Sequence, residues 1–480
     1  MLRAAAVLQR QNRISEAVDT YRVLLARWPG HGDSWFNLAL LQRRLGRFQD
    51  ALLAYQRAIE AGVSRPEEAH LNRAVIYTDH LALHAAAELE LRRAISLNPA
   101  FLPALLNLAN LCEDLGQRDE ALSLYERILS QDPHFFEALA RLANLLPPGE
   151  ALAAFVPRLE GALSDPAASS ADRASLGFAL GRALDALGEY ARAFRAYADA
   201  NRASRASVPP QLARYDRLRH ANFIDRLIAA PTAAQGLPGD CAQTPEPIFV
   251  CGMFRSGSTL AEQLLATRAG VAAAGELDFL PRLIGAELAP YPESLASLTE
   301  QRVAALAAAY RAELARLSPG ATHVIDKRPD NFLHIGLIKR LFPRAKIIHT
   351  TRDALDNCLS IYFLHLDQSM SYALDLLDIG HYFREYRRLM AHWRALFPGD
   401  IFDFDYDALV QEPQEVLRRA GEFLGIRSSE PAPVAAGRAI KTASVWQVRE
   451  PLYRSSSGRA RHYAQELQEL RRYLSFAPST

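Results

Sequence analysis

The chain has 480 residues, of which 49% are hydrophobic and 23% charged, and its net charge is +1. Such a composition is typical of a soluble globular protein, and the length exceeds what one hydrophobic core usually serves, so we expect two or three domains. A nearly neutral chain has no global basic field to attract nucleic acid or a membrane surface, and we expect neither as a partner.

The four cysteines are scattered and form no C-x-x-C pair. This spacing argues against a zinc site or a disulfide framework and fits a reducing compartment. No apolar run approaches the ~20 residues of a membrane helix. The apolar patch near Met1 is too short and too polar in its flanks for a signal peptide, so the expected location is cytoplasmic.

The first part of the chain carries a pattern that recurs about every 34 residues. An alanine is followed by two apolar or aromatic positions at helical spacing, at Ala17, Ala51, Ala87, Ala121 and Ala193. The wider gap before Ala193 fits a degenerate repeat near residues 145–163. Small residues at helix crossings and Leu-Gly pairs in the turns resemble tetratricopeptide repeats, helical hairpins that stack into a solenoid. We predict this domain over residues 1–205.

The solenoid is either a scaffold for the rest of the chain or a concave surface that holds a protein or peptide, and its sequence favours neither. The first repeat begins at Met1 itself. Either the natural start lies elsewhere or this end of the solenoid is open.

Residues 206–246 are rich in proline and glycine and predict a linker, with a bridging helix near residues 212–227. The next domain, residues 247–475, alternates strands and helices. We expect strands before Gly252 and at 323–327, 345–350 and 400–404, with helices at 260–266, 299–317, 332–341, up to Ser360, and 372–395. This alternation predicts a parallel α/β sheet whose ligand lies beyond the carboxyl ends of the strands.

A glycine-containing loop follows the first of these strands, from Gly252 to Thr259. Backbone N–H groups in a strand–loop–helix turn favour an anion. The spacing is nearly that of the nucleoside-triphosphate loop, G-x-x-x-x-G-K-[ST], but Ser258 stands at the lysine position. That change argues against hydrolysis of ATP or GTP, and we expect Lys327, at the next strand end, to supply the missing cation.

Arg352 and Ser360 follow a later strand end, and the arginine can bind a second phosphate through two hydrogen bonds. Two separate phosphate sites fit an adenosine with a 3′-phosphate and a 5′-linked group. At this point the chain resembles the sulfotransferase family, in particular the tyrosylprotein branch and bacterial proteins that join it to tetratricopeptide repeats. The motifs are Gly252–Thr259 with Gly275-Glu276, Asp326–Pro329, Arg352–Ser360 and Tyr406–Val410, within roughly Pro247 to Tyr463.

The resemblance implies 3′-phosphoadenosine 5′-phosphosulfate as the donor cosubstrate. The residues implied to bind its 5′ end are Arg255, Ser256, Gly257, Ser258 and Thr259. Arg352 and Ser360 would bind the 3′-phosphate and Tyr406 the adenine. Ser444 and Arg459 match a late serine and a late basic residue, usually lysine, that close over the donor.

Glu276 matches the catalytic glutamate of the family, although Leu277 stands where eukaryotic members have a second glutamate. An attacking hydroxyl must lose a proton, for which a carboxylate is a suitable base. Lys327 and Arg255 are the cations that would stabilise charge on the transferred group. No metal is expected, because a sulfuryl group carries less charge than a terminal phosphoryl group. Pro329 stands where the phenol- and steroid-type branch has a histidine base, which disfavours that branch.

The sequence predicts a sulfotransferase that acts on a hydroxyl of a protein or peptide, tyrosine above all. Small-molecule and polysaccharide acceptors stay open, as does the oligomeric state. Two other hypotheses are a kinase that uses ATP with an unusual loop, and a non-catalytic repeat adaptor with a degenerate second domain. Taken singly, each residue also has a structural explanation: Lys327 and Asp326 as a surface ion pair, Ser360 as a packing residue, and His349 as a structural histidine.

Overall fold

The structure is a computed structural model that describes residues 1–231, 244–366, 370–426 and 457–475. Its contacts divide the chain into two compact units, one over Met1–Pro147 and one that begins at Pro148. The second unit contains the described part of the predicted α/β domain and also the last helices of the predicted repeat domain. The predicted boundary at residues 205 and 206 falls inside this unit and stays a prediction.

The first unit consists of helical hairpins, as the repeat pattern predicts. Its alanines at the helix crossings, Ala17, Ala51, Ala87 and Ala121, are all fully buried. A larger side chain at these positions would hold the two helices of a hairpin apart. The helices are α1 Leu2–Arg10, α2 Ile14–Arg27, α3 Gly32–Arg44, α4 Phe48–Glu60, α5 Pro66–Asp79, α6 His84–Leu97, α7 Leu102–Leu115, α8 Arg118–Gln131 and α9 Phe136–Leu145.

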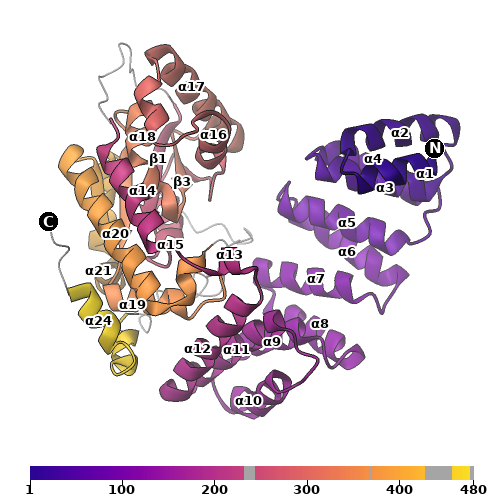
Figure 1. The fold of residues 1–480 in the computed structure, drawn as a ribbon, viewed down its shortest axis with the longest axis horizontal. Coiled ribbons are helices and arrows are strands. Elements are labelled where there is room, and N and C mark those ends of the chain that lie inside the picture. The colour runs from indigo at the N-terminus through magenta and orange to yellow at the C-terminus, as the bar shows by residue number, and fades with distance from the viewer. Residues whose placement is uncertain (232–243, 367–369, 427–456, 476–480) are drawn as a thin grey trace. The chain divides into compact units, whose positions relative to one another are not determined.

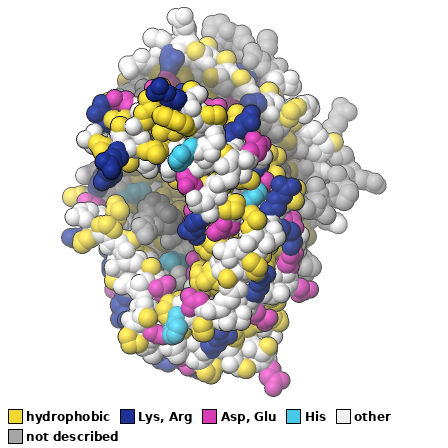
Figure 2. Space-filling view, turned by 90° about the vertical axis from the view of Figure 1, so that its right-hand side faces the viewer, with side chains coloured by type: hydrophobic (Ala, Val, Ile, Leu, Met, Phe, Trp, Pro, Cys, Tyr) yellow, Lys and Arg dark blue, Asp and Glu magenta, His cyan; other side chains and the backbone are white. Residues whose placement is uncertain are grey.

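Figure 2 shows hydrophobic side chains at the surface, among Lys and Arg side chains. Large apolar side chains that are about half exposed include Met1, Val7, Val23 and Trp28 in the first two helices and the turn after them. Scattered exposed apolar residues are normal on a folded chain, so they identify no partner.

The second unit begins with the remaining hairpins, whose helices are α10 Glu150–Leu163, α11 Ser170–Ala186 and α12 Tyr190–Ala206. Helix α10 covers most of the degenerate repeat predicted near residues 145–163. Helices α11 and α12 cross closely because Gly181 leaves room for the ring of Tyr197, which a Cβ atom would meet at 2.8 Å. The hairpin α11–α12 packs directly on the α/β domain: the rings of Tyr197 and Phe363 stack with centroids 3.8 Å apart.

The α/β domain is built on a five-stranded parallel sheet with the strand order β2-β3-β1-β4-β5. The strands are β1 Glu246–Gly252, β2 Val271–Ala273, β3 His323–Lys327, β4 Lys346–Thr351 and β5 Ile401–Asp405. The parallel sheet confirms the predicted fold class. The short edge strand β2 was not predicted, because three residues give too little pattern to recognise.

Helices cover both faces of this sheet, and Figure 1 shows them crowded around β1 and β3. Alternate residues of β1 point to opposite faces. Ile248 and Val250 pack with Ala261 of α15 and Val416 of α22. On the other face Phe249 meets the rings of Tyr310 and Phe342, with centroids 5.8 and 6.0 Å away. Both faces are therefore buried, as expected of a parallel sheet.

The helices around the sheet follow the predicted order with shifted ends. The bridging helix is α14 Arg217–Ala229, after the short α13 Pro210–Ala213. The others are α15 Ser258–Leu265, α16 Phe279–Glu287, α17 Glu300–Leu317, α18 Ile335–Leu341, α19 Ala354–Tyr362, α20 Leu376–Leu396, α21 Tyr406–Gln411, α22 Pro413–Leu424 and α24 Gln468–Ser475. Short 3₁₀ turns η1 Glu293–Ser297, η2 Pro329–His334, η3 Ser371–Leu374 and η5 Arg459–Tyr463 join them. Within the described ranges, no helix has the length and apolarity needed to cross a membrane.

Candidate functional site

The loop between β1 and α15 turns sharply at the carboxyl edge of the sheet. Gly252 lies so close to β4 that a Cβ atom would come within 2.4 Å of the Thr350 carbonyl oxygen. Gly257 has a φ of +98°, and a Cβ atom there would meet the ring of Tyr406 at 2.8 Å. Arg255 adopts a φ of +67°, which is unusual for a residue with a side chain. Backbone strain of this kind is often found where a ligand is bound.

The amino end of α15 has the features of an anion site. Its N-cap residue is Gly257, which has no side chain to accept from the first-turn N–H groups. Those N–H groups and the positive end of the helix dipole point out of the sheet edge. Ser258 and Thr259, both predicted to bind phosphate, are the first two residues of this helix.

Arg255, Arg352 and Ser360 come together although they are far apart in the sequence. The Arg255 Nε donates to the Ser360 Oγ over 3.3 Å, and the Arg352 Nη1 donates to the Arg255 carbonyl oxygen over 3.4 Å. Ser360 is thus more than a packing residue of α19. The contact joins the residue predicted for the 5′ end of the donor to the pair predicted for the 3′-phosphate.

Positive charge is concentrated in this cluster. Burial, together with the charges of Arg352 and Arg459, lowers the pKa of the Arg255 guanidinium to about 10. Burial also lowers the pKa of Arg352. Guanidinium groups that depress one another's pKa are stabilised by a bound anion. The cluster therefore favours an anionic ligand.

Tyr406 lies between the loop and the arginine cluster. It is the first residue of α21, whose N-cap Asp405 accepts from the Ala408 N–H over 2.8 Å. The Arg352 guanidinium lies over the Tyr406 ring, 5.2 Å from its centroid. The ring also packs on Gly257, and its contact with adenine stays a prediction.

Lys327 and Glu276 form an ion pair on the other side of β1, with the Nζ and Oε1 atoms 2.5 Å apart. Lys327 pairs with Val250 in the sheet register, close to the start of the glycine loop. The lysine side chain is 3% exposed and that of Glu276 is 44% exposed. The buried Lys327 ammonium lies beside the accessible Glu276 carboxylate, and this arrangement is suited to proton transfer.

Asp326 is not the surface partner of Lys327. It is fully buried and accepts from the Tyr310 hydroxyl over 2.5 Å and from Asn331 Nδ2 over 3.4 Å. Burial raises the pKa of the Asp326 carboxyl to about 7, against the opposing effect of these hydrogen bonds. The residue ties β3 to α17 beneath the ion pair.

The Ser256 hydroxyl forms a hydrogen bond within the protein, to Thr350. The Thr350 hydroxyl donates to the Cys251 carbonyl oxygen over 3.1 Å, so the 2.6 Å contact between the Ser256 and Thr350 hydroxyls is donated by Ser256. Ser256 therefore ties the loop to β4, and a ligand bound there would meet its backbone rather than this hydroxyl proton.

Arg459, predicted to close over the donor, lies on η5 and pairs with Asp185 of α11. Its charge contributes to the lowered pKa of Arg255 and Arg352, which places it near both. Ser444, the other late residue of the prediction, lies outside the described residues.

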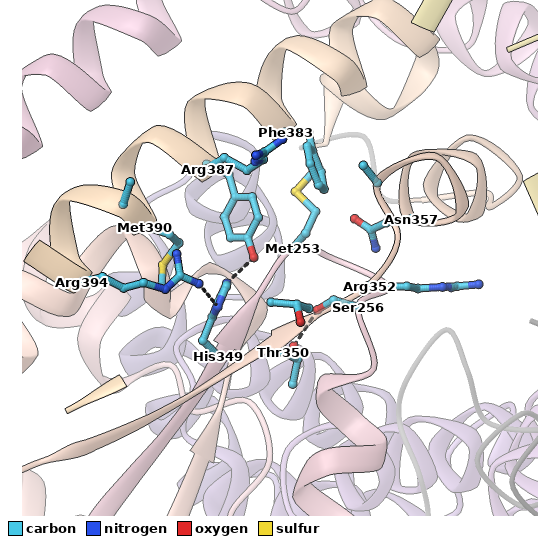
Figure 3. Close-up of a pocket in the computed structure, with 14 residues that line it drawn as sticks. Met253, Ser256, His349, Thr350, Arg352, Asn357, Phe383, Arg387, Met390 and Arg394 are labelled. Carbon is cyan, nitrogen blue, oxygen red and sulfur yellow. Dashed lines mark hydrogen bonds between the residues drawn. The ribbon is translucent and has the colours of Figure 1, made fainter. Parts of the chain in front are cut away.

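A cavity of about 330 Å³ opens beside the loop, between the end of β4 and the helices α19 and α20 (Figure 3). Ser256 and Arg352 reach it from the predicted site. Asn357 lines it and donates through Nδ2 to the Phe254 carbonyl oxygen over 3.0 Å, whereas its buried Oδ1 meets no donor among the described residues. Its other lining residues are Met253, His349, Thr350, Thr351, Ala354, Phe383, Tyr386, Arg387, Met390, Ala391 and Arg394.

A hydrogen-bonded network centred on His349 forms the floor of this cavity. The His349 Nδ1 lies 2.6 Å from the Asp403 Oδ1, its Nε2 contacts the Tyr386 hydroxyl, and Arg394 Nη2 lies 2.5 Å from the same Asp403 atom. Burial lowers the pKa of His349. The network joins β4, β5 and α20, so this histidine is structural. No local sequence pattern indicates the network, because its members lie on three separate elements.

Comparison with known proteins finds family matches for both parts of the chain. The family model described as "Sulfotransferase family" matches residues 247–430. Models of the tetratricopeptide repeat match residues 2–66, 44–100 and 102–145. The repeat matches come first in the chain and the sulfotransferase match follows them, which is the predicted order.

Relatives differ in how much of the chain they share. An uncharacterized protein of Aquifex aeolicus (strain VF5) is 34% identical over 399 residues, 80% of this chain and 51% of that protein. A putative protein-tyrosine sulfotransferase of Caenorhabditis briggsae is 24% identical over 196 residues, 38% of this chain and 66% of that protein. The omega-hydroxy-beta-dihydromenaquinone-9 sulfotransferase of Mycobacterium bovis is 30% identical over 115 residues, 22% of this chain and 30% of that protein.

The chain spans about half the length of the Aquifex relative. Its own two parts are each matched by a family model, the repeats in the first unit and the α/β domain in the second. The chain therefore carries a sulfotransferase-family domain joined to tetratricopeptide repeats.

Proposed function

We propose that the chain transfers a sulfuryl group from 3′-phosphoadenosine 5′-phosphosulfate to a hydroxyl group of a protein or peptide, tyrosine above all. The observation that carries the proposal is the convergence of Arg255, Arg352 and Ser360 beside the glycine loop. A cluster of this charge at the carboxyl edge of a parallel sheet favours a nucleotide with phosphates at both ends of its ribose.

The donor would lie along the sheet edge. Its 5′-phosphosulfate would accept from the backbone N–H groups at the amino end of α15 and from Arg255. Its 3′-phosphate would lie between Arg352 and Ser360, and its adenine against Tyr406. Each of these groups is held by contacts within the protein, so little ordering is needed when the donor binds.

Glu276 and Lys327 would carry out the transfer. The acceptor oxygen forms a bond to sulfur while the bond between sulfur and the 5′-phosphate oxygen breaks. Glu276 takes the hydroxyl proton as the general base, and the half-exposed carboxylate is within reach of an acceptor. Lys327 and Arg255 stabilise the negative charge that develops on the leaving phosphate oxygen.

Two observations support a protein acceptor. One relative is named as a putative protein-tyrosine sulfotransferase, and tetratricopeptide repeats form concave surfaces that can hold a peptide. We propose that the repeats of the first unit bind the acceptor protein. A relative that acts on a dihydromenaquinone makes an apolar small molecule the second candidate, for which the cavity lined by Met253, Phe383 and Met390 offers an apolar wall.

Calorimetric titration of the full chain with adenosine 3′,5′-bisphosphate tests the proposed donor site. We expect binding without a metal ion, and a loss of about tenfold or more for Arg352→Ala, which removes a charge-assisted contact to phosphate. Magnesium-dependent binding of ATP, with none of the bisphosphate at millimolar concentration, would instead support the kinase hypothesis. Absence of both would support the adaptor hypothesis.

A further inference from the structure

The described C-terminal segment, residues 457–475, is fixed against α19 by carboxylates. The Asp356 side chain accepts from the backbone N–H groups of Gly458 and Ala460, over 2.5 and 2.6 Å. The Ser457 hydroxyl donates to Asp407 over 2.6 Å. Asp356 lies one turn before Ser360 on the same helix, so η5 is held next to the predicted 3′-phosphate residues.

Arg459, on η5, is held in turn by Asp185 of the last helical hairpin. The Arg459 Nε and Nη2 atoms lie 3.2 and 2.5 Å from the two carboxylate oxygens of Asp185. The Tyr463 hydroxyl also donates to Asp185. The pair is largely shielded from water, with side-chain exposures of 27% for Arg459 and 16% for Asp185. A two-point contact of this kind fixes the guanidinium plane, and the guanidinium also lies over the Phe363 ring, 5.2 Å from its centroid.

The hairpin α11–α12, which carries Asp185, is packed against the α/β domain. The hairpin α11–α12 joins the α/β domain through the stacked rings of Tyr197 and Phe363 and of Phe178 and His365, the latter with centroids 5.0 Å apart. The Asn201 Nδ2 donates to the Tyr362 carbonyl oxygen over 2.9 Å. These contacts are made at the end of α19, just after Ser360, so the hairpin packs against the helix that carries Ser360.

We infer that Asp185 is a positioning residue of the donor site: it holds Arg459 beside Arg352 and Ser360, ready to bind the 3′-phosphate. The last helical hairpin is then part of the donor site rather than only a support for protein partners. This inference rests on the proposed function, because it needs a donor with a 3′-phosphate.

Electrostatics support the assignment. Three arginines, Arg255, Arg352 and Arg459, lie within range of one another's charge. Like charges repel, so the three guanidinium groups disfavour one another's presence. The Asp185 carboxylate offsets this repulsion and spares the arginine the entropy cost of being ordered by the ligand.

The test compares two ligands that differ only in the 3′-phosphate, adenosine 3′,5′-bisphosphate and adenosine 5′-monophosphate. Calorimetry on the full chain gives the ratio of their affinities. In Asp185→Asn the preference for the bisphosphate should fall roughly tenfold, the loss expected when one charge-assisted hydrogen bond is misplaced. Asp199→Asn is the matched control, because Asp199 is on the same hairpin and pairs with Arg202 at the surface.

A second variant separates positioning from general loosening of the fold. Arg459→Ala should lower the same preference, and Asp185→Asn should then have no further effect in the Arg459→Ala background. Equal loss of affinity for both ligands in Asp185→Asn would overturn the inference, as would tighter binding of the bisphosphate, which would mean that Asp185 competes with the ligand. An unchanged preference in Arg459→Ala would overturn it even if Asp185→Asn does not fold. Failure of the wild-type chain to bind the bisphosphate would contradict the proposed function itself.

Discussion

The buried carboxyl of Asp326 makes the stability of the second unit depend on pH. Burial raises its pKa to about 7, whereas an aspartate in an unfolded chain has a pKa of about 3.9. The folded state therefore holds a proton that the unfolded state has lost. The stabilisation is complete below pH 4 and is lost as the pH rises through about 7.

We predict that the wild-type chain loses stability relative to Asp326→Asn between pH 5 and pH 8. Asparagine mimics the protonated carboxyl, can still accept from Tyr310, and does not ionise. The difference should reach about 2–3 kcal/mol at the higher pH. Thermal unfolding of both proteins across this range is the measurement, with the exposed Asp199→Asn as control. Parallel curves for wild type and Asp326→Asn would show that the carboxyl does not change its charge.

At the scale of elements, the turn from β1 into α15 depends on a glycine. Gly257 combines a φ of +98° with close contact to Tyr406, so Gly257→Ala should cost about 1 kcal/mol or more and displace the ring expected to contact adenine. Gly285→Ala is a matched control inside α16, where a Cβ atom meets nothing within 4 Å. That change should be neutral or stabilise the helix by up to about 1 kcal/mol.

Thermal unfolding and titration with adenosine 3′,5′-bisphosphate measure both effects of these glycine variants. Gly257→Ala should unfold at a lower temperature and bind more weakly, whereas Gly285→Ala should bind as wild type does. Wild-type binding by Gly257→Ala would mean that this turn does not shape the donor site.

Most of the elements could be predicted from the sequence, because their signals are local. The buried alanines repeat at helical spacing, and apolar runs followed by glycine or a charged residue mark the ends of β1, β3 and β4. The edge strand β2 escaped prediction because Val271–Ala273 is too short to show a period. The start of α15 at Ser258 rather than Leu260 reflects a cap made by glycine, which has no side-chain signal.

The site was predictable only in part. The glycine loop, Lys327 and Arg352 stand at strand ends, where the topology of a parallel sheet brings them to one edge. The contacts of Asp185 with Arg459, and of His349 with Asp403 and Tyr386, join residues on separate elements. Nothing near any one of them in the sequence indicates its partner, so only the folded chain reveals these pairs.

At the scale of the whole molecule, the last hairpin should belong functionally to the α/β domain. A chain that begins at residue 148 keeps α11 and α12 and should bind adenosine 3′,5′-bisphosphate as tightly as the full chain. A chain that begins at residue 207 loses Phe178, Asp185 and Tyr197 and exposes the surfaces that they cover. It should be unstable or bind the bisphosphate more weakly.

Binding titrations and thermal unfolding of the two shortened chains check this expectation. Wild-type affinity in the chain that begins at residue 207 would place the functional boundary after α12. Loss of binding in the chain that begins at residue 148 would instead mean that the first unit contributes to the donor site.

The central claim is that the chain transfers a sulfuryl group with Glu276 as the base. The most direct measurement incubates the protein with labelled 3′-phosphoadenosine 5′-phosphosulfate and a lysate of its source cells, and traces the label into the acceptor fraction. We predict transfer by the wild-type chain and a loss of roughly 100-fold or more in Glu276→Gln, because a general base contributes a factor of that order, with binding of adenosine 3′,5′-bisphosphate unchanged. No transfer by the wild-type chain, or equal transfer by Glu276→Gln, would contradict this claim.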